Sequence, residues 1–242
     1  MAAPGTHRAH AQPAYVLHSY PYRESSLVVE AFTRDCGRIA LVARGARRQK
    51  SALRGVLLAF QPLLLSWSGR GELRTLTGAE WDGPYAPLKG RALVCGFYLN
   101  ELLLKFLARD DPHERLYATY AGTLAELARE EQQAATLRRF EVSLLRELGY
   151  AVTLDRDVES GEPIQGARRY RYLPERGPVA AGAAAAEGVE LAGQTLLDMQ
   201  AGDYTSAVTL QQSRTLMRAL INHHLGGQVL HTRRLLRDLQ EL

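Results

Sequence analysis

The stretch SLVVEAFTRDCGRIALVAR, residues 26–44, decides the fold of the first third of the chain. Ser26–Thr33 is a run of β-prone residues with the length of one strand. Arg34–Gly37 follows with Asp and Gly, which are typical of a tight turn. Arg38–Arg44 then alternates in part, with aliphatic side chains on one face and its two terminal arginines on the other. The stretch therefore predicts two consecutive strands joined by a turn.

On either side of this stretch, three further runs predict strands: Tyr15–His18 before it, and Leu63–Trp67 and Glu72–Leu76 after it. Gly69–Gly71 separates the last two runs as a turn. Five short strands with hairpin-like spacing indicate a small barrel or a sandwich, and the sequence leaves both open.

After Trp81 the pattern changes from strands to helices. Asp82–Pro87 contains two prolines and a glycine and predicts a linker. Apolar residues then recur at helical spacing. Helices are expected at 93–109, from 112 onward, and at 134–148, 189–199, 206–225 and 233–239. Residues 150–188 are irregular, apart from a candidate strand at Arg168–Tyr172.

These patterns predict a short disordered tail at residues 1–12, a strand domain at 13–80, and a helical domain at 81–242 with an irregular insert at about 150–188. The tail has no apolar block and is therefore not expected to be a secretory signal. No apolar run approaches the roughly 20 residues of a membrane span, so no membrane partner is expected.

Charge is unevenly distributed along the chain. Residues 1–80 contain eleven basic and five acidic residues, a net charge of +6, and because the whole chain carries +4 the remainder carries −2. A basic first third predicts an anionic partner for that part. A general preference for arginine along the chain is the alternative explanation.

A basic loop, residues 44–55, connects the third and fourth expected strands and contains no acidic residue. It is expected to be a mobile surface loop or a short helix, and a solvated loop without a ligand is the alternative. Cations on such a loop can neutralise successive phosphates without reading base identity. The predicted DNA-binding residues are Arg44, Arg47, Arg48, Lys50 and Arg54. Five aromatic residues of this part of the chain could either stack on bases or pack in the core. They are Tyr15, Tyr20, Tyr22, Phe32 and Trp67.

A second candidate site lies on the helix expected at 134–148. Arg138 and Arg139 stand beside an apolar stripe that includes Leu137 and Phe140. Paired arginines can hold a carboxylate while the stripe takes an adjacent apolar side chain. The alternative is an exposed helix face with local pairing, such as Arg138 with Glu141.

The sequence lacks the motifs of common catalytic sites. It has no Gly-x-Ser-x-Gly elbow and no phosphate loop ending in Gly-Lys-Ser/Thr, and His113-Glu114 is not followed by the second histidine of a zinc protease. Asp110-Asp111 is a close carboxylate pair that is expected to cap a helix. No catalytic residue is therefore predicted, and the chain is not expected to be an enzyme.

No metal or other cofactor is predicted either. Cys36 and Cys95 are too few and too far apart in sequence for a disulfide framework or a zinc site, and they are expected to be reduced thiols. His223 and His224 are adjacent on an expected helix, so their side chains should point about 100° apart and should not share one metal ion.

Seven segments occur in an order that is specific to one protein family. They are Tyr15–Ser19, Gly37–Arg47, Gln61–Leu65, Gly69–Leu73, Tyr98–Leu102, Leu137–Tyr150 and Ser160–Pro163. Their ordered combination, which spans residues 15–172, resembles RecO, a bacterial recombination and repair family.

The resemblance implies an α+β multidomain fold, with an N-terminal OB-fold β-barrel followed by a mainly α-helical C-terminal domain. It implies binding of single- and double-stranded DNA, annealing of complementary strands, and action with RecR and single-stranded-DNA-binding protein (SSB) in loading RecA in the RecF pathway. A cytoplasmic, nucleoid-associated location follows from that role.

The resemblance also assigns residues. The family's DNA contacts map onto Arg44, Arg47, Arg48 and Lys50, and its pocket for the acidic C-terminal tail of SSB maps to the helical domain, with Arg138 as the candidate.

Many relatives carry a four-cysteine zinc module after the third helix. Residues 150–172 contain no cysteine, so zinc is not carried over.

Two other functions stay open from the residues alone. A metal-dependent enzyme that processes nucleic acid would need clustered carboxylates for its divalent cations. The other is a protein-interaction scaffold that does not bind DNA, in which the positive charge of the first third would have no function.

Overall fold

A computed structural model describes residues 8–84, 86–129, 132–182 and 187–233 of the chain. The chain divides into two compact units, Met1–Glu130 with Leu230–Leu242, and Glu131–Val229. The first unit contains a barrel and the two helices that follow it. Contacts between the barrel and these helices, described below, hold them in one unit. Among the residues that are described, no helix combines the length and the hydropathy needed to cross a membrane.

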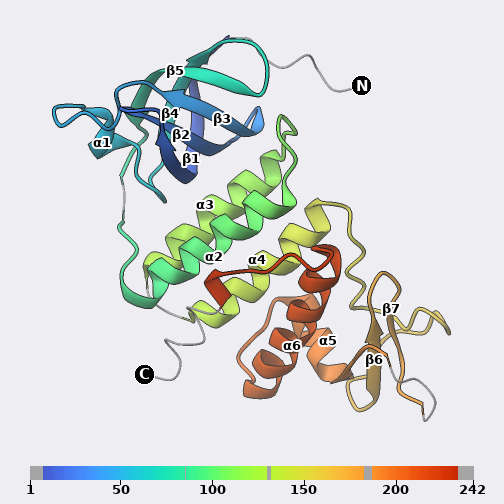
Figure 1. Ribbon diagram of the computed structural model, residues 1–242. Helices are drawn as coiled ribbons and strands as arrows, with labels where there is room; N and C mark the ends of the chain where they lie inside the picture. Colours follow the sequence, from blue (N-terminus) through green and yellow to red (C-terminus); the bar gives the residue numbers. More distant parts are fainter. Residues whose placement is uncertain (1–7, 85, 130–131, 183–186, 234–242) are drawn as a thin grey trace. The chain divides into compact units, whose positions relative to one another are not determined.

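Five strands close into a barrel in the first unit (Figure 1). They are β1 (Arg8–Tyr22), β2 (Ser26–Thr33), β3 (Gly37–Ala43), β4 (Leu63–Ser68) and β5 (Leu73–Trp81). Their order around the barrel is β1-β2-β3-β5-β4, and all neighbouring strands are antiparallel except β3 and β5. This is a closed, OB-like Greek-key barrel, so the barrel is confirmed over the sandwich.

The expected disordered tail is wrong for residues 8–12, which belong to β1. Arg8 pairs with Ser68 and Ala9 with Trp67 on β4. This part of β1 is specified by backbone pairing with β4 rather than by its own apolar pattern, so its sequence gave no strand signal. Residues 1–7 lie outside the described part of the chain.

The barrel interior is filled by alternating side chains from its strands. β4 alternates between buried and partly exposed positions along its whole length, and places Leu63, Leu65 and Trp67 in the core with no exposed surface. Side chains alternate in this way because successive residues of a strand point to opposite faces. On β3, Ile39 and Leu41 fill the same core, as the partial alternation of that segment predicts.

Two helices complete the first unit: α2 (Gly90–Phe106) and α3 (Glu114–Ala128). Asn100 of α2 is buried, and its side-chain amide donates to the carbonyl of Leu17 on β1 at 2.8 Å. The same amide accepts a hydrogen bond from the Tyr120 hydroxyl of α3 at 2.5 Å. Because a buried polar side chain needs such partners, Asn100 fixes both helices against one strand of the barrel.

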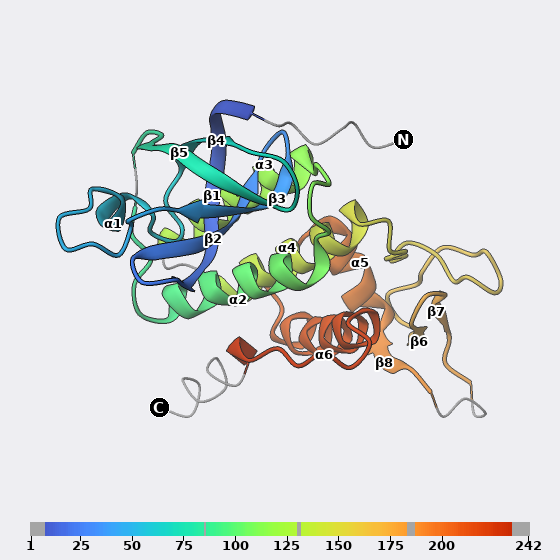
Figure 2. The ribbon, with the colours of Figure 1, turned by 45° about the horizontal axis from the view of Figure 1, so that its top comes forward.

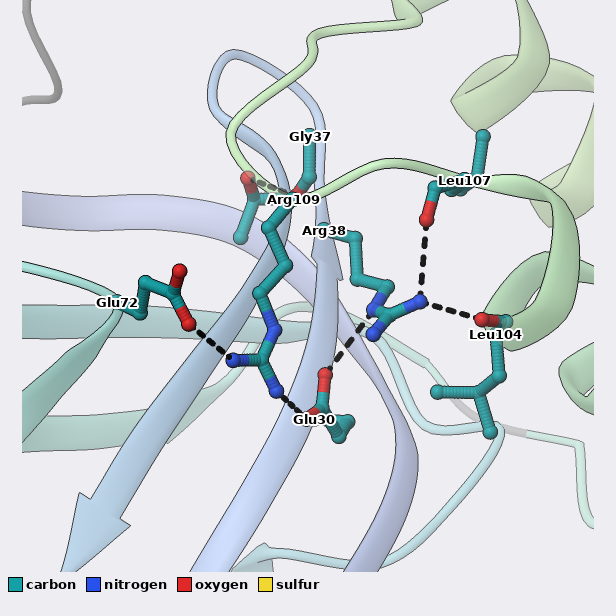
Figure 3. A network of polar contacts seen from close by, with 8 residues as sticks. Glu30, Gly37, Arg38, Glu72, Leu104, Leu107 and Arg109 are labelled. Atoms are coloured by element: carbon teal, nitrogen blue, oxygen red, sulfur yellow. Dashed lines mark hydrogen bonds and ion pairs between the residues drawn. The ribbon is translucent and has the colours of Figure 1, made fainter.

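A polar network joins the end of α2 to the barrel (Figure 3). The Arg38 guanidinium donates to the carbonyls of Leu104 and Leu107, which are free for a side chain because they lie at the C-terminal end of the helix. Its Nε lies 3.1 Å from Oε2 of Glu30. Arg109 binds the other oxygen of Glu30 at 2.5 Å and reaches Glu72 at 3.3 Å.

The connector between α2 and α3 docks on the barrel at a second point. Asp110 binds Arg74 of β5 at 2.7 Å, and its backbone N–H donates to the carbonyl of Arg38 at 2.9 Å. Gly37 stands against Asp111 so closely that a Cβ atom would lie 2.0 Å from its carbonyl oxygen. The expectation that Asp110 caps a helix is therefore wrong: the N-cap residue of α3 is His113, and Asp110 is an ion-pair partner of the barrel.

The chain returns to the first unit near its end. The Glu101 carboxylate of α2 accepts hydrogen bonds from the backbone N–H groups of His231 and Thr232 and from the Thr232 hydroxyl. Burial raises the pKa of Glu101, but these hydrogen bonds outweigh burial and lower it overall. Beyond Arg233, the helix expected at 233–239 lies outside the described residues.

The second unit combines helices with a small sheet (Figure 2). Its elements are α4 (Gln133–Glu147), β6 (Arg169–Leu173), β7 (Gly177–Ala180), β8 (Val189–Ala192), α5 (Gly193–Ala201) and α6 (Ala207–His224). The strands form an antiparallel sheet in the order β7-β6-β8. The predicted strand at 168–172 is confirmed as β6. The rest of the insert at 150–188 is less irregular than expected, because it contains β7, which pairs with β6.

The helix expected at 189–199 is only partly correct. Its first four residues form β8, and α5 begins at Gly193. β8 has the length of a short strand and pairs with β6 over its whole length. A strand of four residues carries too few positions to show a period, so its partner is needed to identify it.

Glu30→Gln tests how much the network in Figure 3 contributes to stability. The substitution keeps the side-chain shape but removes the charge that Arg38 and Arg109 share, which leaves two guanidinium groups in a poorly solvated place. We expect the free energy of unfolding, measured with urea, to fall by about 2–4 kcal/mol. The matched control is Glu72→Gln, whose carboxylate is 83% exposed and which should cost less than about 1 kcal/mol. Equal losses in both variants would contradict a buried, shared role for Glu30.

Candidate nucleic-acid interface

The basic loop projects from the barrel between β3 and β4, together with the short helix α1 (Leu53–Val56) (Figures 1 and 2). All five predicted DNA-binding side chains are exposed: Arg44, Arg47, Arg48, Lys50 and Arg54. Both structural alternatives for this segment are therefore partly correct, since it is a surface loop that ends in one helical turn. The binding role of these residues stays a prediction.

Arg47 anchors the basic loop on the turn between β1 and β2. Its backbone N–H donates to the carbonyl of Ser25 at 2.9 Å, and its guanidinium reaches the carbonyls of Arg23 and Glu24 at 3.4 and 3.2 Å. Within the described residues, none of the five cations of the loop forms a salt bridge with a carboxylate. No acidic side chain in the described ranges therefore compensates the positive charge of the loop, and Arg47 differs from the other four because it also holds the loop in place.

The turn that receives Arg47 adds residues that sequence reasoning did not select. Arg23 lies in this turn, and its guanidinium stands over the ring of Tyr22, 5.2 Å from the ring centroid. Tyr20 is 41% exposed, and the ring of His18 stacks beside it at a centroid distance of 6.1 Å. No local pattern marks Arg23, because only the docking of the basic loop brings it to this site.

The structure separates the aromatic candidates for base stacking. Tyr15, Phe32 and Trp67 are buried, so they belong to the core. Tyr20 and Tyr22, at the end of β1, keep accessible surface. An exposed aromatic ring beside uncompensated cations is the combination that single-stranded nucleic acid uses for stacking and phosphate contact.

A shallow depression of about 410 Å³ lies between the basic loop and the barrel. Aliphatic side chains form much of its surface, and two arginines of the loop border it. The residues that line it are Ser19, Leu27, Ala46, Arg47, Leu53, Arg54, Leu57 and Leu58. An apolar floor next to guanidinium groups can accept the face of a base while its phosphate is neutralised.

The second candidate site differs from its prediction in one respect. Leu137 and Phe140 are 7% and 1% exposed, so they pack in the core and offer no apolar groove at the surface. Arg138 binds the carboxylate of Glu141 at 2.5 Å, which is the local pairing that the sequence left as the alternative. Arg139 donates to the Thr136 hydroxyl at 3.3 Å. The periodicity of α4 identified the buried stripe correctly but could not tell a stripe that faces the core from one that faces a ligand.

Tyr204, which follows α5, is an unpredicted neighbour of this arginine pair. Burial raises the pKa of Tyr204 to about 12, and the charges of Arg138 and Glu141 act on it in opposite directions. Its hydroxyl is therefore neutral at physiological pH and can serve as a hydrogen-bond donor beside Arg138. It lies more than sixty residues further along the chain, so no spacing in the sequence indicates it.

Carboxylates and histidines are the side chains of this protein that could act as metal ligands or catalytic groups. Asp110 is paired with Arg74, and Asp111 with His113 at 3.2 Å, so this acidic pair does not form a common cation site. Among the described residues, one cluster brings ligand atoms together: Glu175, His223 and His224. The expectation that the two histidines point apart is therefore wrong in this structure.

Comparisons with known proteins agree with this architecture. A family model described as "Recombination protein O N terminal" matches residues 8–85, and one described as "Recombination protein O C terminal" matches residues 88–234. A protein of Nitrosospira multiformis named "DNA repair protein RecO" is 57% identical over 236 residues, which cover 97% of this chain and 98% of that protein. Proteins with the same name from Aromatoleum aromaticum and Ralstonia nicotianae are also 57% identical, and the matches cover 96% and 100% of this chain and 96% and 89% of theirs.

Proposed function

The chain belongs to the RecO family of DNA repair proteins, and from this premise we propose that it binds single- and double-stranded DNA through the barrel and anneals complementary strands. One observation supports this most directly: the cations of the basic loop are exposed, and no carboxylate of the described residues pairs with them. We further propose that the protein works without catalysis, in the cytoplasm and in association with the nucleoid.

Annealing follows from charge neutralisation and from stacking. Two strands repel each other through their phosphates, and a surface that neutralises several phosphates lowers this repulsion while releasing bound counterions. Contacts to phosphates hold the backbone without reading sequence, which suits a protein that must accept any complementary pair. Tyr20 offers a ring on which one base of a single strand can stack.

The family role also names protein partners for this proposal. They are RecR and SSB, with which the protein would promote the loading of RecA. For the SSB tail, Arg138 remains the candidate, because a guanidinium can meet a carboxylate with two parallel hydrogen bonds. Any tail carboxylate would have to compete with Glu141, which already holds this guanidinium.

An annealing assay with labelled complementary strands separates this function from the two alternatives. The protein should accelerate annealing equally with and without Mg²⁺, and the strands should stay intact. Cleavage that depends on Mg²⁺ would point to an enzyme, and the absence of both annealing and DNA binding would point to a scaffold.

Reversal of three loop charges, in Arg48→Glu/Lys50→Glu/Arg54→Glu, should weaken DNA binding. These three are preferred over Arg47 because they do not anchor the loop, so their loss should leave the barrel folded. Loss of three phosphate contacts should flatten the slope of log affinity against log salt by roughly 2–3 units. Fluorescence anisotropy of labelled DNA across a salt series measures both quantities.

The matched control for this triple variant is Arg91→Glu/Arg115→Glu/Arg168→Glu. It changes the net charge by the same amount at exposed positions outside the basic loop. The control should lower affinity only slightly and should leave the salt slope close to that of the wild type. Identical slopes in the wild type and the loop variant would remove the basic loop from the DNA site.

Tyr20→Ala tests whether the exposed ring stacks on DNA. We expect affinity for single-stranded DNA to fall by about 1–3 kcal/mol, the range for one base–aromatic stack. Duplex affinity should change much less, because paired bases are already stacked inside the helix. Phe97→Ala, which removes another half-exposed ring on α2, is the control and should affect neither substrate. An equal loss for both substrates would argue against stacking.

Arg138→Ala should weaken binding of a peptide with the acidic SSB tail by about 1–3 kcal/mol, the range for a charge-assisted hydrogen bond. Glu141→Gln should act in the opposite direction, because it removes the competing carboxylate while keeping its shape. Anisotropy of a labelled peptide measures both, with circular dichroism to confirm that each variant is folded. Wild-type peptide affinity in Arg138→Ala would instead make this arginine a purely structural partner of Glu141.

A further inference from the structure

Three metal-ligand groups from two distant segments converge in the second unit. Glu175 lies in the turn between β6 and β7, and His223 and His224 are the last two residues of α6. One oxygen of Glu175 and one nitrogen of each histidine all lie within 4.8 Å of one another. The Nε2 atom of His223 is already 2.9 Å from Oε1 of Glu175.

The position of the histidines at a helix end explains why neighbours on one helix can converge. α6 ends at His224, and Gly226 and Gly227 follow with positive φ angles of 58° and 90°. The ring of His224 stacks on Tyr150 at a centroid distance of 4.0 Å, and the ring of His223 stands at 80° to it. Tyr150 thus holds the ring of His224, and one nitrogen of each histidine lies within 4.8 Å of the other and of a Glu175 oxygen.

We propose that Glu175, His223 and His224 bind one zinc ion, with water as the fourth ligand. Zinc favours tetrahedral sites of nitrogen and oxygen ligands at about 2.0–2.2 Å, which places neighbouring ligand atoms about 3.4 Å apart. The pair Glu175–His223 needs to open by only a few tenths of an ångström to reach that separation. The nitrogen of His224, which lies within 4.8 Å of both other ligand atoms, is the third ligand.

The surroundings of the cluster favour a bound cation. The C-terminal end of a helix carries partial negative charge, and both histidines lie there.

A zinc ion at this place would tie the β6–β7 turn to the end of α6. Without metal, the hydrogen bond between Glu175 and His223 already makes this connection, but Glu175 is 71% exposed and such a surface contact contributes little. The site shares no residue with a four-cysteine module, and it is independent of the proposed DNA-binding role. Its consequence is a second unit whose stability depends on the metal.

Zinc titration into the untagged, chelator-treated full chain tests the proposal by calorimetry. The wild type should bind one equivalent, and Glu175→Gln, His223→Gln and His224→Gln should each weaken binding. Since loss of even an outer-sphere partner of a ligand costs about 10- to 100-fold in metal affinity, each loss should be at least tenfold. The control is His18→Gln, an exposed histidine of the barrel, which should keep wild-type affinity.

Two further readouts make the outcome decisive. Cobalt in place of zinc should give the visible absorption of a tetrahedral site in the wild type and lose it in Glu175→Gln, a substitution in an exposed turn that should not disturb folding. Zinc should raise the melting temperature of the wild type but not that of Glu175→Gln. Failure of the wild type to bind zinc, or wild-type affinity in the Glu175 and His223 variants, would overturn the proposal and leave a simple hydrogen bond.

Discussion

The carboxylate of Glu30 is the group on which the first unit depends. It is 7% exposed and accepts hydrogen bonds from two guanidiniums, one on the next strand and one beyond the end of α2. An unpaired buried charge is strongly destabilising, so Arg38 and Arg109 must both approach the same point of the barrel. Arg38 then also satisfies helix-end carbonyls of α2. One buried charge therefore connects two strands of the barrel to the end of α2 and to the connector that follows it.

This arrangement sorts the arginines of the basic first third into two groups. Arg38 and Arg74 have carboxylate partners within the first unit and contribute to its stability. The cations of the basic loop have no such partners within the described residues, and one of them, Arg47, holds the loop on the β1–β2 turn. Five of the eleven cations of residues 1–80 therefore lie together on one loop. A charge count alone could not make this distinction, because paired and unpaired arginines look alike in a sequence.

The second unit shows how residues of different segments acquire a common role. Tyr204 comes close to Arg138 and Glu141, although their segments are far apart in the chain. The turn at Glu175 meets the end of α6 in the same way. In both cases a titratable group gains neighbours through packing of helices and hairpins, and its protonation and ligand-binding properties follow from those neighbours.

The sequence by itself determined the elements with a clear period: four of the five barrel strands within a few residues, the long helices α2, α4 and α6, and the exposed cations of the basic loop. Only the tertiary structure decided that the strands close into a barrel, that residues 8–12 extend β1, and that Leu137 and Phe140 face the core. It also decided that Asp110 pairs with Arg74 and that His223 and His224 converge on Glu175. The physical reason is that period and composition report on local backbone geometry and solvent exposure, whereas barrel closure, ion-pair choice and ligand clusters depend on which distant backbone and side-chain groups the packed chain brings within a few ångströms.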